Sequence, residues 1–466
     1  MAYNTLAMPP FFRYKTLDDL REAARAEAPE VVVAEDVSPL LRPIAIGNRI
    51  AGNRLAVHPM EGCDGTLGGE PDDLTFRRWK GFGAGGAKVI WGEATAVAPE
   101  ARANPRQLLL TRETAPSIGR LLGETRKAHR DRFGRDDDLL VGLQLTHSGR
   151  WSFPRPLIAT HLAAVDAAKG FGPDHPTLDD TYLDELQERY VEAAAMAEVA
   201  GFDFVDIKQC HTYLLNELLA SSARPGKYGG GFEGRTRFVR EVFAAIRRRA
   251  PGLVLATRLN VYDGPPYRGE AGAPGEAATT GASAWGSSPG DPLAPDLGEP
   301  LRLIGLLTEV GLGLVNVTMG SPYYNPHIGR PFERAPVDGY KPPEHPLAGV
   351  ERHFRLTAAV QEAYPNLAVI GTGYSWLRHF AANAGAANVA AGRASIMGLG
   401  RGALAYPDFA ADVVERGAMV DRKSCIGVSY CTALMRAKHN ELGQFPTGCA
   451  PRDSFYAEQY RLATRG

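Results

Sequence analysis

The sequence predicts a (β/α)₈ barrel, an α/β fold with eight parallel strands inside and helices outside. Two observations predict it: eight short apolar runs recur along the 466 residues, and helical patterns separate them. The runs are nearly continuous rather than alternating, as expected for parallel strands that are buried on both faces. An open, doubly wound sheet is the alternative, but eight strands alternating with helices favour closure into a barrel.

The eight expected strands are rich in aliphatic and β-branched residues. In chain order they are Arg54–Met60, Lys88–Val97, Leu139–His147, Phe202–Lys208, Leu253–Asn260, Leu314–Met319, Leu367–Gly373 and Asn388–Arg393.

The clearest helical pattern covers Asp179–Ala200, where apolar residues recur at three- and four-residue steps. Thr177 and Asp180 predict a capping box at its start, and Gly201 predicts its end. Similar patterns cover Arg235–Arg249 and Leu301–Val310.

Three segments interrupt this alternation. Residues 1–52 predict an N-terminal extension, with a helix over 16–28 and a hairpin over Leu41–Asn53 that leads into the barrel at 53–420. Residues 264–298, after strand five, are rich in Gly, Pro, Ala and Ser, and such a composition predicts a long surface loop with little order of its own. This loop reads either as a lid over the barrel mouth or as a tolerated insertion. Residues 421–466 form a C-terminal extension with three of the five cysteines.

The charge and composition of the chain argue against nucleic acid and membranes as binding partners. The net charge of −1 gives no electrostatic footprint for nucleic acid or an anionic membrane, and no apolar run is long enough to span a bilayer. The first residues lack the pattern of a secretory signal, and five cysteines, an odd and small number, favour a reducing compartment. We therefore expect a cytoplasmic protein with a small-molecule substrate; a homo-oligomer is compatible with the sequence.

Polar residues gather where the expected strands end, and that end of a barrel carries the chemistry. Strand four ends in a lysine, an imidazole and a phenol, while strands seven and eight end in glycine-rich turns, the second with an arginine. Small residues there let backbone N–H groups approach a phosphate, so the pattern indicates a phosphate-bearing cofactor. The residues concerned are Lys208, His211, Tyr213, Gly371, Gly373, Gly392 and Arg393.

The chain resembles the Old Yellow Enzyme family of NAD(P)H:flavin oxidoreductases. The resemblance rests on an ordered set of segments between about Asn53 and Arg393: NRLAVHPM, GGAKVIWGEATAV, GLQLTHSGR, AEVAGFDFVDIKQCHTYLLNELLA, KYGGGFEGRTRF, LATRLN, VIGTG and AAGRA. It implies FMN across the barrel mouth and NAD(P)H as co-substrate.

The resemblance also implies residue roles. Tyr213 matches the proton donor, and Lys208 and His211 stand at the two positions that bind the carbonyl oxygen of the acceptor. The residues implied in FMN binding are Pro59, Met60, Glu61 and Ala94 near the ring, Gln144 and Arg258 at the pyrimidine edge, and Gly371, Gly373, Gly392 and Arg393 at the phosphate.

Two residues depart from the family pattern. The family usually has His where this chain has Lys208, and Thr or Cys where it has Glu61. Because two isolated charges are costly to desolvate, we expect a Lys208–Glu61 salt bridge, which an anionic acceptor would displace. The alternative is that Lys208 points into solvent or pairs with another acid.

The tail resembles a degenerate form of the iron–sulfur segment of the trimethylamine dehydrogenase and dienoyl-CoA reductase branch. It holds Cys425, Cys431 and Cys449, but Val428 stands where a further cysteine is needed for a C-x₂-C pair. Because a four-iron cluster usually takes four thiolates, we expect no iron–sulfur cluster and no metal.

The sequence therefore predicts an FMN-dependent oxidoreductase that passes hydride from NAD(P)H to an electron-poor unsaturated acceptor, in the manner of an ene-reductase. Three alternatives stay open. They are an amine or alkyl-group dehydrogenase that passes electrons onward, a non-redox phosphate-binding barrel with a Schiff base at Lys208, and a catalytically silent FMN-binding protein.

Overall fold

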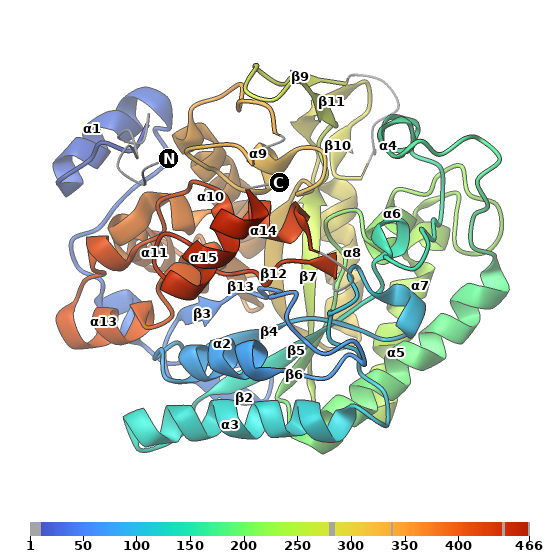
Figure 1. Ribbon diagram of the computed structural model, residues 1–466, viewed down its shortest axis with the longest axis horizontal. Coiled ribbons are helices and arrows are strands. Elements are labelled where there is room, and N and C mark those ends of the chain that lie inside the picture. Colours follow the sequence, from blue (N-terminus) through green and yellow to red (C-terminus); the bar gives the residue numbers. More distant parts are fainter. Residues whose placement is uncertain (1–10, 279–284, 337–338, 440–442, 465–466) are drawn as a thin grey trace.

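The computed structural model describes residues 11–278, 285–336, 339–439 and 443–464. Eight parallel strands close into a barrel in the order β12-β13-β14-β3-β4-β5-β6-β7, which confirms the predicted fold class (Figure 1). These strands are β3 (Leu55–Val57), β4 (Val89–Ala96), β5 (Leu140–Thr146), β6 (Phe204–Ile207), β7 (Val254–Tyr262), β12 (Leu312–Met319), β13 (Ala368–Gly371) and β14 (Ile396–Leu399).

Helices surround the strands on the outside (Figure 1). Those that follow or precede the barrel strands are α2 (Asp73–Gly83), α3 (Ala115–Phe133), α5 (Asp180–Ala200), α7 (Phe232–Arg249), α8 (Gly298–Glu309), α10 (Pro346–Ala363), α11 (Ala381–Ala390) and α13 (Phe409–Arg416). The shorter ones are α4 (Ala163–Lys169), α6 (Leu214–Leu219), α9 (Pro326–Gly329) and α12 (Arg401–Ala405).

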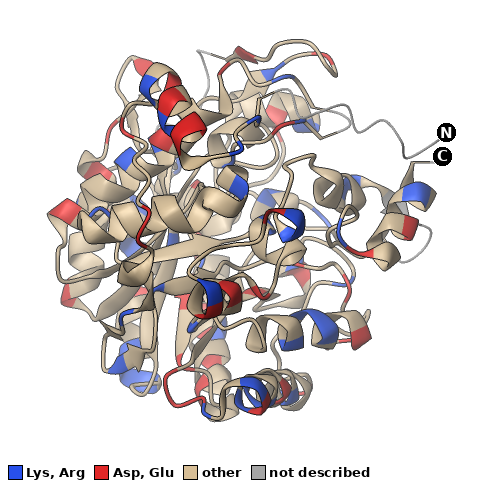
Figure 2. Ribbon diagram, turned by 90° about the vertical axis from the view of Figure 1, so that its left-hand side faces the viewer, with Lys and Arg blue, Asp and Glu red and all other residues tan. Residues whose placement is uncertain are grey.

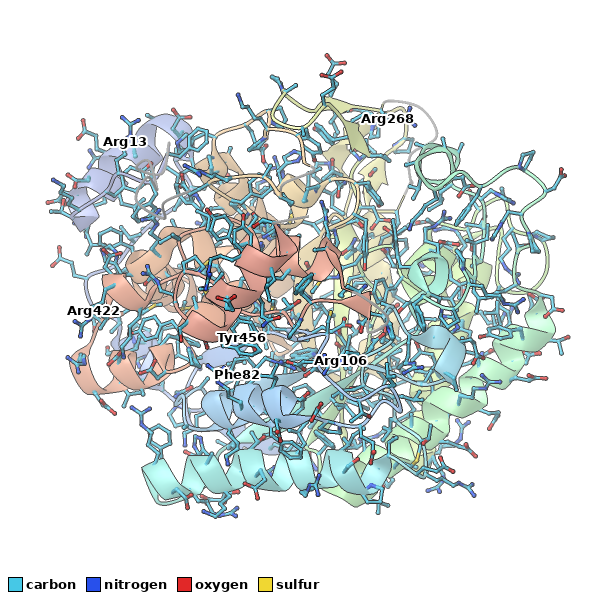
Figure 3. All side chains as sticks on the ribbon, viewed as in Figure 1. Arg13, Phe82, Arg106, Arg268, Arg422 and Tyr456 are labelled. Atoms are coloured by element: carbon cyan, nitrogen blue, oxygen red, sulfur yellow. The ribbon has the colours of Figure 1, made fainter. Side chains whose placement is uncertain are left out.

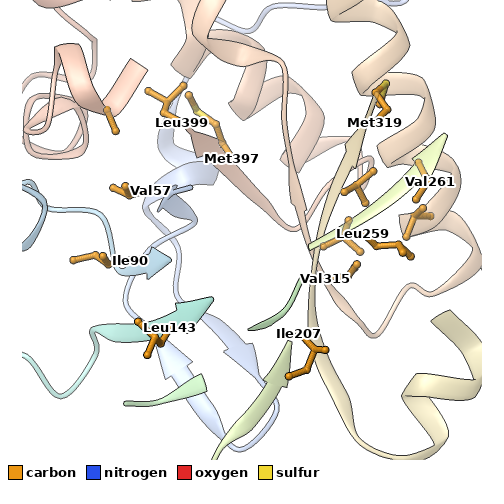
Figure 4. Close-up of a cluster of buried hydrophobic side chains, with 14 of the residues drawn as sticks. Val57, Ile90, Leu143, Ile207, Leu259, Val261, Val315, Met319, Met397 and Leu399 are labelled. Carbon is orange, nitrogen blue, oxygen red and sulfur yellow. The ribbon is translucent and has the colours of Figure 1, made fainter. Parts of the chain in front are cut away.

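Successive strand residues alternate between two apolar layers. In β4, Val89 and Trp91 belong to the cluster inside the barrel, while Ile90 belongs to the larger cluster between strands and helices. Figure 4 shows this outer layer, with Val57, Ile90 and Leu143 among its side chains. Burial on both faces explains why the strands read as continuous apolar runs.

The predicted N-terminal hairpin is confirmed, and it seals the amino-terminal end of the barrel. Strands β1 (Ile44–Ile46) and β2 (Arg49–Ala51) pair antiparallel. Ile46 and Ala51 are fully buried and join the inner apolar cluster. The expected helix before it is α1 (Leu17–Glu27), whose N-cap Thr16 forms a capping box with Asp19.

The insertion after β7 is more ordered than its composition predicts. It forms two short antiparallel pairs, β8 (Tyr267–Arg268) with β9 (Glu276–Ala277) and β10 (Ser287–Ser288) with β11 (Asp291–Pro295). Trp285 is fully buried, and its indole Nε1 donates to the carbonyl of Asn260 at 2.8 Å. That anchor supplies the apolar burial that the rest of the segment lacks; residues 279–284 lie outside the described part.

The C-terminal extension packs on the barrel through α14 (Tyr430–Arg436), the short pair β15 (Lys438–His439) and β16 (Gly443–Gln444), and α15 (Ser454–Ala463). Tyr456 of α15 lies on the side of that helix that faces α2 (Figure 3), and the guanidinium of Arg77 in α2 lies 5.8 Å from its ring centre. The backbone N–H of Thr447 donates to the carbonyl of Gly62 at 2.7 Å. The tail is thus attached to the loop that follows the first barrel strand.

Two predictions about elements are wrong. Asn388–Arg393 is not a strand: its first residues end helix α11, whose alanine-rich sequence has little apolar periodicity, and the eighth strand is β14. Helix α5 is capped by Asp179, whose carboxylate accepts from the N–H of Tyr182, rather than by Thr177. Its predicted C-cap is confirmed, because Gly201 has a φ of 93°.

Charged residues of both signs are interspersed on the side of the molecule in Figure 2, without a face of one sign. None of the helices in the described ranges is both long enough and apolar enough to cross a lipid bilayer.

Candidate functional site

A cavity at the carboxyl ends of the barrel strands gathers most of the predicted site residues. Those that line it are Pro59, Met60, Glu61, Ala94, Gln144, Lys208, His211, Tyr213 and Arg258. They come from the ends of β3 to β7, because the carboxyl ends of all parallel strands meet at one mouth.

The segment after β6 carries the three predicted catalytic residues. Lys208 is buried, and its ammonium nitrogen lies 3.5 Å from the centre of the Tyr213 ring. The Tyr213 hydroxyl lies 3.2 Å from that of Tyr323. Burial raises the pKa of Tyr213 well above its usual range and lowers the pKa of Lys208 and of His211. At neutral pH the site therefore contains a protonated phenol and a neutral imidazole.

The backbone of this segment is strained. His211 and Thr212 have φ values of 66° and 57°, a left-handed conformation that costs about 1–3 kcal/mol for each non-glycine residue. Asn216 holds the turn, since its side-chain oxygen accepts from the N–H of Thr212 at 2.7 Å. The turn places the imidazole and the phenol at the same cavity.

The expected Lys208–Glu61 salt bridge is wrong. Among the described residues, Lys208 has no carboxylate within ion-pair distance, and Glu61 accepts instead from the side-chain amide of Asn104. Burial raises the pKa of Glu61 to about 7, although the nearby Lys208 opposes the shift. The aromatic ring of Tyr213, rather than an acid, faces the lysine.

A buried carboxylate in β6 links this strand to its neighbours at the site. Asp206 in β6 accepts from the Gln144 side chain at 2.5 Å, from the Trp91 indole at 2.8 Å and from the backbone N–H of Arg258 at 2.7 Å. Burial raises its pKa to about 6. Asp206 therefore fixes two of the residues predicted to face the flavin. The sequence offered a signal for it, an acid inside an apolar strand.

The structure contradicts the predicted placement of Gly392 and Arg393. Both precede β14 and so lie at the amino-terminal end of the barrel, opposite the cavity. The Arg393 guanidinium pairs with the carboxylate of Glu30 at 3.0 Å. The prediction failed because the eighth strand begins eight residues later than the expected one.

The arginine that follows the true eighth strand is Arg401. It lines the cavity, as the first residue of α12. The next residue, Gly402, donates its N–H to the Ser375 hydroxyl at 3.1 Å, which joins this turn to the segment after β13. A second Gly-Arg pair, Gly400-Arg401, is the sequence signal that would have identified it.

Gly371 and Gly373 do lie at the carboxyl end of β13, but they are not among the residues that line the cavity. Gly373 has a φ of 90°, and an added Cβ would lie 2.8 Å from the Cβ of His353. Close packing therefore already requires glycine there. A contact with phosphate stays a prediction.

Several cavity residues were not predicted from the sequence. The loop after β12 contributes Pro322, Tyr323, Pro326, Gly329 and Arg330, and the C-terminal extension contributes Cys431, Thr432, Met435 and Thr447. The end of the predicted strand Leu314–Met319 was a signal for Pro322 and Tyr323, whereas no strand-end pattern marks the residues of the tail.

The three tail cysteines are free thiols. Burial raises the pKa of Cys449, and the neighbouring Cys425 and Cys431 add to the shift. Over the described ranges, no group of three or more His, Cys, Asp or Glu side chains is arranged to hold a metal ion.

The cavity fits the FMN that the sequence predicts. Arg258 Nε is buried and has no hydrogen-bond partner among the described residues. Because buried donors are normally bonded, it can donate to an acceptor such as the pyrimidine edge of the flavin. Pro59, Met60 and Ala94 supply an apolar surface for a ring system. The Arg401 guanidinium, which has no ion pair in the described part of the chain, offers a partner for a phosphate.

Comparisons with known proteins agree with the motifs. Residues 39–270 match the NADH:flavin oxidoreductase / NADH oxidase family. The NADPH dehydrogenase of Clostridium acetobutylicum is 30% identical over 234 residues, 49% of this chain and 64% of that protein. The NADPH dehydrogenase of Geobacillus sp. (strain WCH70) is 30% identical over 237 residues, 49% of this chain and 62% of that protein. The chain thus covers less than two thirds of these curated relatives.

Solved structures share the barrel at low sequence identity. A 2-naphthoyl-CoA reductase complex has a TM-score of 0.65 at 16% identity, covering 91% of this chain and 58% of the other. Morphinone reductase in complex with tetrahydroNAD has a TM-score of 0.56 at 20% identity, covering 82% and 92%. These likenesses establish the fold. The match over residues 39–270, just under half of the chain, places that segment in the NADH:flavin oxidoreductase / NADH oxidase family, in agreement with the ordered Old Yellow Enzyme motifs.

Proposed function

We propose that the protein is an FMN-dependent oxidoreductase that transfers hydride from NAD(P)H to an electron-poor carbon–carbon double bond, as an ene-reductase does. One observation carries the proposal. Lys208, His211 and Tyr213 line the same cavity as Gln144 and Arg258, so the residues proposed as proton donor, carbonyl-binding groups and flavin-binding groups share one mouth of the barrel. Relatives whose names describe NADPH dehydrogenases support the nicotinamide co-substrate.

FMN, when bound, supplies a carrier that takes up and releases hydride. Arg258 would hold its pyrimidine edge with a positive charge, and Gln144, oriented by Asp206, would hydrogen-bond the same edge. Arg401 would hold its phosphate.

Tyr213 would deliver a proton to the acceptor carbon next to the carbonyl. Burial raises its pKa well above the usual range, so it stays protonated at neutral pH and can donate as a carbanion forms. Lys208 and His211 would bind the carbonyl oxygen, and donors placed in advance stabilise the charge that develops there. Because the His211 imidazole is neutral, one of its ring nitrogens carries a proton for this bond.

The test combines cofactor analysis with the two half-reactions. The purified protein should show flavin absorbance and release FMN on denaturation. Tyr213→Phe should slow reoxidation by 2-cyclohexenone about 100-fold or more, the usual scale of general acid catalysis. Reduction by NAD(P)H should be unchanged, since phenylalanine keeps the ring that faces Lys208. Equal losses in both half-reactions would contradict the role of Tyr213. Colourless protein that borohydride traps with a carbonyl compound at Lys208 would favour the Schiff-base alternative.

We also propose a cytoplasmic location. All five cysteines are free, which suits a reducing compartment. Cell fractionation with activity in the membrane or extracellular fraction would contradict it.

A further inference from the structure

Arg330 is a cavity residue that the proposed chemistry leaves unused. It follows helix α9, and its guanidinium lines the same cavity as Lys208 and Tyr213. Its Nη2 donates to the Thr432 hydroxyl in the C-terminal extension at 2.8 Å. Among the described residues it has no ion pair, so most of its five N–H donors are not used by the protein.

The cavity carries more positive than negative charge. Its charged lining residues within the described ranges are Lys208, Arg258, Arg330, Arg401 and Glu61. Glu61 offers little compensation, because burial raises its pKa to about 7 and its carboxylate is already bonded to Asn104. FMN would occupy Arg258 and Arg401, and Lys208 lies over the Tyr213 ring. Arg330 is then a cation whose one side-chain hydrogen-bond partner among the described residues, Thr432, is neutral, which favours an anion from outside the chain.

The loop that carries Arg330 also contacts the predicted proton donor. The Tyr323 hydroxyl lies 3.2 Å from the Tyr213 hydroxyl, and Pro326 and Gly329, the end residues of helix α9, line the same cavity. When the reacting carbon of an acceptor substrate lies against Tyr213, the other atoms of that substrate are therefore in contact with this loop.

We infer that Arg330, held by Thr432, forms a subsite for a carboxylate carried by the acceptor. The inference rests on the proposed function and names its substrate class as unsaturated acceptors with an acid group. A guanidinium can bind a carboxylate with two parallel hydrogen bonds, an arrangement that a neutral acceptor cannot form. Arg330 could also bind a phosphate of NAD(P)H instead of a substrate carboxylate, and the experiment distinguishes these two ligands.

The probes are 3-oxocyclohex-1-ene-1-carboxylate and its methyl ester, which differ in charge but share the reacting enone. Their binding to the FMN-loaded protein is measured by calorimetry without NAD(P)H. Arg330→Gln should weaken carboxylate binding about 10- to 100-fold and leave ester binding unchanged, as expected for charge-assisted hydrogen bonds. Arg334→Gln is the matched control, because that arginine is exposed on the same loop and lies outside the cavity.

Two further variants keep the inference testable if Arg330→Gln does not fold. Arg330→Lys should retain part of the preference for the carboxylate, and Thr432→Val should weaken it by a smaller factor because the charge remains. Equal carboxylate affinities in wild type and both variants would overturn the inference. A loss of NAD(P)H affinity in Arg330→Gln, with carboxylate affinity unchanged, would also overturn it. If the wild type reduces neither probe with NAD(P)H, the proposed function fails, and the calorimetric comparison still decides the subsite.

Discussion

Glu61 shows how burial sets the charge of a single residue in this cavity. Its carboxylate lies near Lys208 but is bonded to Asn104, and desolvation outweighs the attraction of the lysine. The pKa of Glu61 therefore rises from about 4.5 to about 7. At neutral pH the group is close to half protonated, so its charge responds to pH where most carboxylates do not.

This shift predicts a pH-dependent stability. Between about pH 4.5 and 7 the folded state keeps the Glu61 proton that the unfolded state has lost, so the free energy of unfolding falls as pH rises. One such group contributes at most about 1.4 kcal/mol per pH unit. Urea unfolding from pH 4.5 to 8 should show wild type losing stability relative to Glu61→Gln, with the difference constant above about pH 7. Parallel curves over the whole range would contradict the shift.

Arg393 and Arg401 each follow a glycine in the sequence, but they lie at opposite ends of the barrel. Arg401→Ala should weaken FMN binding about 10- to 100-fold, because its guanidinium lines the cavity and would hold the phosphate. Arg393→Ala is the matched control and should leave FMN affinity unchanged, since that side chain pairs with Glu30 at the other end. Fluorescence titration of FMN into each apoprotein measures both; a larger loss in Arg393→Ala would contradict this assignment.

The C-terminal extension is the element that completes the cavity wall. Helix α14 brings Cys431, Thr432 and Met435 to the cavity, and Thr447 follows from the next segment. Its own small apolar cluster includes Leu434, Phe445, Ala450 and Tyr456. Because this cluster is separate from the main core, the extension can loosen without unfolding of the barrel.

Tyr456→Ala tests that independence. The Tyr456 side chain is 7% exposed, and removal of a large buried aromatic side chain costs about 3 kcal/mol. Amide exchange in α14 and α15 should accelerate, while exchange in the barrel strands stays slow. Phe455→Ala is the control, because the neighbouring side chain is 37% exposed. Equal acceleration in the barrel would show that tail and barrel unfold as one unit.

The molecule as a whole depends on close packing inside a closed barrel. At Gly142 in β5 an added Cβ would lie 2.1 Å from the Phe204 ring of the neighbouring strand. The strands around it pair on both sides, so the clash cannot be relieved at an edge. Strain at this point is therefore shared by the entire barrel.

Gly142→Ala should lower the stability of the barrel by about 1–3 kcal/mol, the usual cost of overpacking. Gly123→Ala is the matched control on helix α3, where an added Cβ has nothing within 4 Å. That exposed helical substitution should raise stability by about 0.5–1 kcal/mol. Thermal unfolding of both variants measures the contrast, and a destabilised Gly123→Ala or an unaffected Gly142→Ala would contradict it.

The sequence by itself determined the barrel and the cavity residues that come from the ends of β3 to β7. Buried parallel strands leave continuous apolar runs, and residues at their carboxyl ends, such as Lys208 and Arg258, converge at one mouth because strand direction fixes it. The prediction failed at the eighth strand, because the sequence predicts a strand at the end of the alanine-rich helix α11 and the true strand β14 is only four residues long. Only the tertiary structure decided that Arg401 faces the cavity, that Tyr213 rather than Glu61 faces Lys208, and that Thr432 of the tail holds Arg330. The Thr432–Arg330 contact joins segments far apart in the chain, so packing between segments sets it. The Lys208–Tyr213 contact is local, but it lies across a turn with positive φ values at His211 and Thr212 that the sequence pattern does not predict.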